Sequence, residues 1–327
     1  MLTDILILIA GFILLIKGAD YLVDGSSRLA RRFGVPPLVI GLTIVAFGTS
    51  APELIVNILA AVQGATDITV GNIIGSNLAN IGLIVGLTAF LYPLKIQGST
   101  IKKEIPFMLL SGLVLLAAAM DKAFNMGTDN FLSRNDGITF LLIFSVFIYY
   151  LIDEIQESRQ QKTTEKKEFA EAYPNKDHSS VKLTFLVLGG LLAVLLGGKL
   201  TVDNAVNIAS ALGISQMLIG VTIVAIGTSL PELTTSIIAA YKKHSDIAVG
   251  NLVGSNIFNT LLILGISAII RPIEFLSAWY LDLIIMLVFS LIILLFAITH
   301  KQIIKRWEGG VLLTAYLMYI IVAISRG

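Results

Sequence analysis

Two carboxyl groups, Glu53 and Glu232, stand inside otherwise apolar runs of the chain. They occupy matching places in Gly41–Leu54, GLTIVAFGTSAPEL, and Gly220–Leu233, GVTIVAIGTSLPEL, which agree at 11 of 14 positions. An ionisable residue at the centre of a bilayer is costly and marks an ion pathway or a paired site. We therefore expect the two glutamates to face each other at the middle of a membrane and to hold a cation.

Hydroxyl and amide side chains accompany both glutamates at helical spacing. Thr49 and Ser50 precede Glu53 by four and three residues, so the three can share one helix face. A second motif, GNIIGSNLAN in one copy and GNLVGSNIFN in the other, repeats polar residues every fourth position, and its glycines allow close helix packing. These polar residues are Asn72, Ser76 and Asn80, and Asn251, Ser255 and Asn259. Together they form an all-oxygen donor set, which suits Ca²⁺ or the similarly sized Na⁺.

A proline precedes each glutamate by one residue. Pro52 and Pro231 lack an N–H group and clash with the carbonyl four residues back, which breaks a helix. The break is expected to free carbonyl groups near Ala46–Thr49 and Ala225–Thr228. Such broken backbone is tolerated at membrane depth only where a cavity, a neighbour or an ion satisfies it.

Less specific interpretations exist for several of these residues. The glutamates could be a structural pair, and the hydroxyl groups could bond back to their own helices. Asn77 and Asn256 are interpreted mainly as packing residues. Asp67 and Asp246 are expected to cap helices. Asp20, Asp24 and Asp203 are expected to be solvated at helix ends. Lys17 and Lys199 are expected to extend their charged groups to the membrane surface. Asp282 has no repeat partner and receives no role.

Composition places these motifs in a membrane. The 327 residues are 56% hydrophobic and 14% charged, with a mean hydropathy of +0.87, whereas soluble domains carry roughly 25% charged residues. The absence of cysteine excludes disulfides and thiolate metal sites. The three histidines lie in or beside polar connections, so a transition-metal pathway is not expected. Neither a nucleic-acid partner, an obligate protein partner nor a cofactor is indicated.

Ten apolar segments of membrane-spanning length are predicted. No basic region precedes the first one, so it is interpreted as a helix rather than a signal peptide. The only substantial polar linker is 156–182, which is expected to be solvated. The predicted spans are 4–24, 37–62, 68–92, 104–120, 137–154, 183–203, 216–240, 247–270, 277–299 and 308–325.

A constant offset of 179 residues relates the two copies of both motifs. Five spans per copy is an odd number, so the second copy must enter the membrane from the opposite side. The fold class is thus an all-α polytopic membrane protein of two inverted five-helix repeats, at 1–155 and 183–327, an architecture of secondary transporters. Connections on one side carry 17 Lys and Arg against four on the other, which predicts a cytoplasmic linker and both termini outside a cell membrane.

The paired motifs resemble the repeats of the cation/Ca²⁺ exchanger superfamily, in particular its sodium/calcium exchanger branch. The resemblance implies ten helices and exchange of external Na⁺ for cytosolic Ca²⁺, with helices 1 and 6 sliding to switch access. It also implies that Asn72 and Asn251 brace the broken helices. The ion ligands that it implies are Thr49, Ser50, Glu53, Ser76, Asn80, Thr228, Ser229, Glu232, Ser255 and Asn259, with the carbonyl groups of Ala46 and Ala225.

One position bears on the branch of the family. Some members, including K⁺-dependent exchangers, carry Asp where this chain has Asn259, and here both copies have Asn. The missing third carboxyl group argues against K⁺ cotransport. A Na⁺/Ca²⁺ antiporter is therefore predicted, with an H⁺/Ca²⁺ or other cation antiporter of the same fold as the alternative. A channel is disfavoured, and no motif supports an enzyme.

Overall fold

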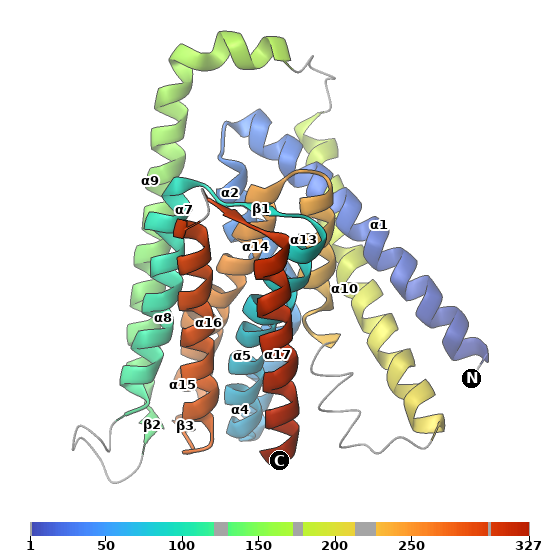
Figure 1. The fold of residues 1–327 in the computed structure, drawn as a ribbon, viewed down its shortest axis with the longest axis vertical. Coiled ribbons are helices and arrows are strands. Elements are labelled where there is room, and N and C mark those ends of the chain that lie inside the picture. The colour runs from blue at the N-terminus through green and yellow to red at the C-terminus, as the bar shows by residue number, and fades with distance from the viewer. Residues whose placement is uncertain (1, 121–129, 173–178, 213–226, 300–301, 327) are drawn as a thin grey trace.

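A computed structural model describes residues 2–120, 130–172, 179–212, 227–299 and 302–326. Its fold is all-α, with long helices packed side by side (Figure 1). Within this part of the chain, seven helices are long and apolar enough to span a membrane, or eight if the bent pair Pro37–Thr49 and Ala51–Gln63 is one span. The chain is thus a multi-pass membrane protein.

The first half of the chain begins with one long helix and continues with two interrupted ones. Each interruption contains a π-helical segment, labelled η. Capping fixes the start of the last helix, where Ser133 and Asp136 exchange backbone-to-side-chain hydrogen bonds. The helices are α1 Leu2–Phe33, α2 Pro37–Ile40, η1 Gly41–Val45, α3 Ala46–Thr49, α4 Ala51–Gln63, α5 Thr66–Leu78, η2 Ala79–Val85, α6 Gly86–Leu91, α7 Gly98–Lys102, α8 Glu104–Ala118 and α9 Arg134–Ala172.

The second half repeats this pattern in its described residues. Its helices are α10 Ser180–Ala211, α13 Leu230–Tyr241, α14 Ser245–Ile257, η4 Phe258–Ile263, α15 Leu264–Ile270, α16 Trp279–Thr299 and α17 Arg306–Arg326. Residues 216–226 of the seventh predicted span lie outside the described residues. In the first half, α9 continues as a helix to Ala172, well into the range expected to be a linker.

Two short strand pairs join the halves at opposite ends of the molecule (Figure 1). Strand β1, Leu94–Lys95, pairs with β4, Ile303–Ile304, and β2, Phe131–Leu132, pairs with β3, Ile273–Glu274. Both pairs are antiparallel, and each takes one strand from each half of the chain. The connections between helices are therefore tied across the halves.

Glycines bring α1 and α10 into close antiparallel contact. A Cβ atom added at Gly18 would lie 2.7 Å from the Val194 nitrogen, and one at Gly190 would lie 2.5 Å from the Leu22 nitrogen. Small residues of this kind let helix backbones approach where lipid offers no hydrophobic drive for association. The two helices form a pair at one side of the molecule (Figure 1).

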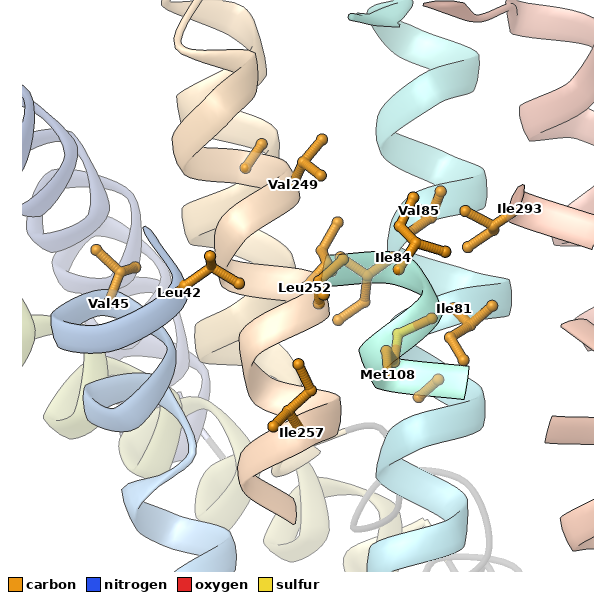
Figure 2. Close-up of a cluster of buried hydrophobic side chains, with 14 of the residues drawn as sticks. Leu42, Val45, Ile81, Ile84, Val85, Met108, Val249, Leu252, Ile257 and Ile293 are labelled. Carbon is orange, nitrogen blue, oxygen red and sulfur yellow. The ribbon is translucent and has the colours of Figure 1, made fainter. Parts of the chain in front are cut away.

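Helix α14 lies at the centre of the core. Leu252 and Ile257 of α14 pack among Leu42 of η1, Ile84 of η2 and other buried apolar side chains (Figure 2). Gly250 permits the contact, because a Cβ atom there would lie 2.6 Å from the Leu38 carbonyl oxygen. The close packing predicted from the glycines of the second motif is thus confirmed for the copy on α14. As a result, the polar face of α14 lies next to the broken helix of the first half.

Candidate functional site

Both glutamate motifs contain the same break in the helix. Ser50 and Ser229 have φ/ψ values of −82°/8° and −88°/3°, and the next helix starts at the following residue, with the proline in its first turn. Proline is tolerated there because the first N–H groups of a helix have no intrahelical partner. The two parts of the first broken span meet at an angle of 49°, so the break that the prolines predict is confirmed.

The carbonyl group of Ala46 differs from expectation. It accepts the Ser50 N–H at 3.0 Å and the Thr49 hydroxyl at 3.3 Å. The prediction of a free carbonyl at this position is therefore wrong, because the helix resumes its i to i−4 pattern up to the break. A carbonyl oxygen has two lone pairs, and a hydroxyl donor is easily displaced. Its counterpart, Ala225, lies outside the described residues.

The two glutamates belong to a single buried site. Glu53 and Glu232 are each only 1% exposed, and their carboxyl groups lie in the same buried region of the molecule. The hydroxyl of Ser50, from the first motif, donates to Glu232 Oε1 at 3.2 Å. Ser76 lies beside Glu53 and interacts with its carboxyl group. Residues about half the chain apart thus converge.

Oxygen atoms without hydrogen-bond partners concentrate at this site. A buried polar atom left without a partner costs about 1–3 kcal/mol, so such a cluster favours a bound cation that accepts several oxygen ligands. Within the described residues the unpaired atoms of the site are Glu53 Oε2, Glu232 Oε2, Asn80 Oδ1, Asn259 Oδ1, Ser229 Oγ and Ser255 Oγ.

The two predicted bracing asparagines differ from each other. Asn251 is fully buried, donates to Ser236 Oγ at 3.1 Å and to the Glu232 carbonyl at 3.5 Å, and accepts the Thr49 hydroxyl at 3.0 Å. Asn72 is half-buried, and its Nδ2 has no partner among the described residues. Thr228 is also half-buried. The hydrogen bond from Thr49 to Asn251 therefore links the first broken span to α14.

Local π-helical turns carry two of the predicted ligands. Asn80 lies in η2 and Asn259 in η4, and both are 1% exposed. A π turn inserts one residue into an α-helix and often occurs at a functional site. Neither turn was predicted, because the surrounding residues fit an uninterrupted apolar helix. The repeat of the motif in both halves was the only available signal.

Several charged residues outside the site have partners that were not predicted. Lys242, at the end of α13, pairs with Asp20 at 2.7 Å and Asp24 at 3.0 Å, although both aspartates were expected to be solvated. Burial lowers the pKa of Lys242, but its hydrogen bonds to these aspartates outweigh burial and raise it. Asp282, which had no assigned role, pairs with Arg326.

The fold and the site are those of a membrane ion transporter whose central site is lined with oxygen atoms. Among the described residues no three His, Cys, Asp or Glu side chains cluster, so two carboxyl groups supply the acidic charge. The model of the sodium/calcium exchanger protein family matches residues 3–152 and 182–325. The chain belongs to the sodium/calcium exchanger family, whose members are transporters of ions.

Individual relatives span nearly the whole chain. The sodium/calcium exchanger MaX1 of Methanosarcina acetivorans is 34% identical, with 98% of each chain covered. A solved structure of the sodium-calcium exchanger NCX_Mj has a TM-score of 0.80 and 34% identity, again covering 98% of each chain. The Ca²⁺/H⁺ antiporter ChaA of Bacillus subtilis is 27% identical and covers 93% of this chain and 87% of its own.

Proposed function

We propose that this protein is a secondary active antiporter that exchanges Na⁺ for Ca²⁺ by alternating access. One observation carries the proposal: two buried carboxyl groups, one from each repeated motif, each keep an oxygen without a partner among the described residues. Two ionised carboxyl groups carry a charge of −2, which one Ca²⁺ or two Na⁺ neutralise. A site that either ion can neutralise is the minimum requirement for exchange. The names of MaX1 and NCX_Mj support sodium as the driving ion.

The proposed cation cage draws on both motifs in each half. Its charge comes from Glu53 and Glu232, while hydroxyl, amide and carbonyl oxygens complete the coordination. Asn251 supports it by bracing the broken helices, a role that its three hydrogen bonds favour over the same role for Asn72. The other members of the cage are Thr49, Ser50, Ser76, Asn80, Thr228, Ser229, Ser255, Asn259 and the carbonyl groups of Ala46 and Ala225.

We further propose ten spans arranged as two inverted repeats, 1–155 and 183–327, joined by a cytoplasmic linker, with both termini outside the cell. The distribution of Lys and Arg supports this orientation, and the strand pairs between the halves fit it. In alternating access, α1 and α10, which correspond to the predicted helices 1 and 6, slide against the other helices. Their glycine-lined contact allows them to move as one pair.

The orientation is tested on a background that contains no native cysteine. Ser325→Cys and Glu157→Cys both place a thiol at an exposed position. An impermeant maleimide added to intact cells should label the first variant, and label the second only after the cells are opened. The reverse pattern would refute the proposed orientation.

Transport is tested with ⁴⁵Ca²⁺ uptake into proteoliposomes under an outward sodium gradient. Uptake should follow the gradient and should be abolished in Glu53→Gln and in Glu232→Gln, because each substitution removes charge that the site uses to hold Ca²⁺. Ca²⁺ uptake that does not depend on the sodium gradient would refute this mechanism. Full activity in either variant would show that the cation lies elsewhere.

Proton-driven calcium transport is the second candidate. The name of ChaA supports it, and a glutamate that binds a cation can also carry a proton. A pH gradient imposed on the same vesicles in sodium-free buffer distinguishes the two. Ca²⁺ uptake under that gradient alone would favour protons as the driving ion, whereas its absence would favour sodium.

A further inference from the structure

Asn259 is held in one orientation by a residue outside the predicted cage. Its Nδ2 donates to Asn77 Oδ1 at 3.1 Å, across the two halves of the chain. Both side chains are 1% exposed. The Oδ1 of Asn259 has no partner among the described residues. Because oxygen and nitrogen are the two branches of one planar amide, fixing the nitrogen on Asn77 directs the oxygen away from it.

The orientation of Asn77 is itself determined by the chemistry of its neighbours. Asn77 Nδ2 lies 2.9 Å from Thr260 Oγ1 and 3.6 Å from Met286 Sδ. A thioether sulfur can only accept a hydrogen bond, so the Asn77 nitrogen must face Met286. Its carbonyl oxygen is then turned to Asn259 and accepts from it. The Met286 sulfur therefore fixes the orientation of the Asn77 amide, and the Asn77 amide in turn fixes that of Asn259.

The equivalent asparagine of the other motif does not act in this way. Asn256 donates to the Leu252 carbonyl at 3.1 Å and to Met108 Sδ at 3.5 Å, while its Oδ1 has no partner among the described residues. Ile81 occupies the place that Thr260 has in the second copy. Asn256 borders the same small cavity as Asn77, of about 10 Å³, which also has Ser111 in its lining and which has room for about one water molecule.

We propose that Asn77 is a positioning residue that sets the cation affinity of the site by turning the Asn259 carbonyl oxygen toward the ion. Without the Asn77 acceptor, the Asn259 amide can rotate and present its NH₂ group, which repels a cation. The proposal rests on the proposed function only in taking Asn259 as a cation ligand. Outer partners that orient a ligand typically contribute 10–100-fold to metal affinity.

The test measures equilibrium ⁴⁵Ca²⁺ binding to the purified full chain in sodium-free buffer. Asn77→Leu removes the acceptor while keeping a side chain of similar branched shape, and it should weaken Ca²⁺ binding by about 10–100-fold. Asn256→Leu is the matched control, since it makes the same change at the repeat-equivalent position, and it should bind like the wild type. Thermal melting of each variant without Ca²⁺ confirms that it is folded.

A second background separates orientation from general disturbance. Asn259→Asp supplies two equivalent carboxyl oxygens, so rotation of this side chain no longer matters. The loss caused by Asn77→Leu should therefore largely disappear when it is combined with Asn259→Asp. An equal loss in both backgrounds, or equal losses in Asn77→Leu and Asn256→Leu, would overturn the proposal. A wild type that binds no Ca²⁺ would instead refute the proposed function itself.

Discussion

Asn251 satisfies three polar partners with one side chain. It joins the Thr49 hydroxyl of the first broken span to the Ser236 hydroxyl and the Glu232 carbonyl of α13. All of these groups are buried, where lipid supplies no hydrogen bond, and the Thr49 hydroxyl also lies 3.3 Å from the Ala46 carbonyl oxygen. The residue connects two helices that belong to different halves of the chain.

Replacing this residue should destabilise the protein measurably. Asn251→Leu removes an acceptor of the Thr49 hydroxyl and the donor to Ser236 Oγ, and each lost hydrogen bond contributes about 0.5–1.5 kcal/mol. We expect a clear fall in the melting temperature of the detergent-purified protein without added cation. Asn72→Leu is the control, because Asn72 Nδ2 has no described partner to lose. A comparable fall in both variants would argue against the bracing role of Asn251.

At the scale of helices, the contact between α1 and α10 depends on missing side chains. Gly190→Ala would put a Cβ atom 2.5 Å from the Leu22 nitrogen and 2.9 Å from the Gly18 oxygen. Backbone atoms cannot rotate aside, so the helices must separate, and overpacking of this kind typically costs about 1–3 kcal/mol. We expect a lower melting temperature and slower ⁴⁵Ca²⁺ uptake.

The neighbouring glycine provides the control for this change. Gly189→Ala adds the same methyl group, but apart from its chain neighbours and the backbone of its own helix no described heavy atom lies within 4 Å of the new position. Its melting temperature and transport rate should match the wild type. If the two variants behave alike, close backbone contact between α1 and α10 is not what the glycine at 190 provides.

The junction between α13 and α14 carries a titratable contact with α1. His244 lies 3.5 Å from the Ser27 hydroxyl. Burial lowers the pKa of its imidazole, and Arg31 and Lys242 act in the same direction, against the opposing effect of Asp24 and Asp246. The folded protein therefore favours the neutral ring more than the unfolded chain does.

This difference predicts how stability depends on pH. The folded pKa of His244 lies below the unfolded value of about 6.5. At a pH between these two values, the unfolded chain binds more protons than the folded protein. The free energy of unfolding therefore decreases as the pH falls from the unfolded pKa to the folded pKa. Above pH 6.5 the contribution is complete. Melting between pH 8 and pH 5 should show a steeper acid loss for the wild type than for His244→Gln. Parallel curves would contradict this assignment.

Sequence patterns predicted the helices better than their interruptions. The prolines identified the breaks at Ser50 and Ser229, because a missing N–H group has a local effect. The π turns that contain Asn80 and Asn259 left no such mark. The contact of Asn77 with Met286 spans 209 positions, so its effect on amide orientation depends on tertiary packing. The sequence thus predicted the local effect of the prolines, but it could not predict the orientation of side chains that depends on contacts distant in the chain.

Over the whole molecule, the site lies where the two halves of the chain meet. Each half supplies one glutamate, and the strand pairs β1–β4 and β2–β3 tie the connections of one half to those of the other. A cation bound between the glutamates would add a further link between the halves, and it would relieve the repulsion between the two carboxyl groups. Occupation of the site should therefore affect the stability of the entire fold.

Binding that is restricted to the folded state predicts a quantitative stabilisation. At a Ca²⁺ concentration 100 times the dissociation constant, the free energy of unfolding should rise by about 2.7 kcal/mol. The melting temperature of the purified protein should increase accordingly, return on addition of a chelator, and respond less to Ca²⁺ as Na⁺ rises, because both ions compete for the same two charges. The combined variant Glu53→Gln, Glu232→Gln should show no response to Ca²⁺. If Ca²⁺ stabilises that variant as much as the wild type, the stabilising cation binds outside the glutamate pair. The competition between Na⁺ and Ca²⁺ would then take place at a different site.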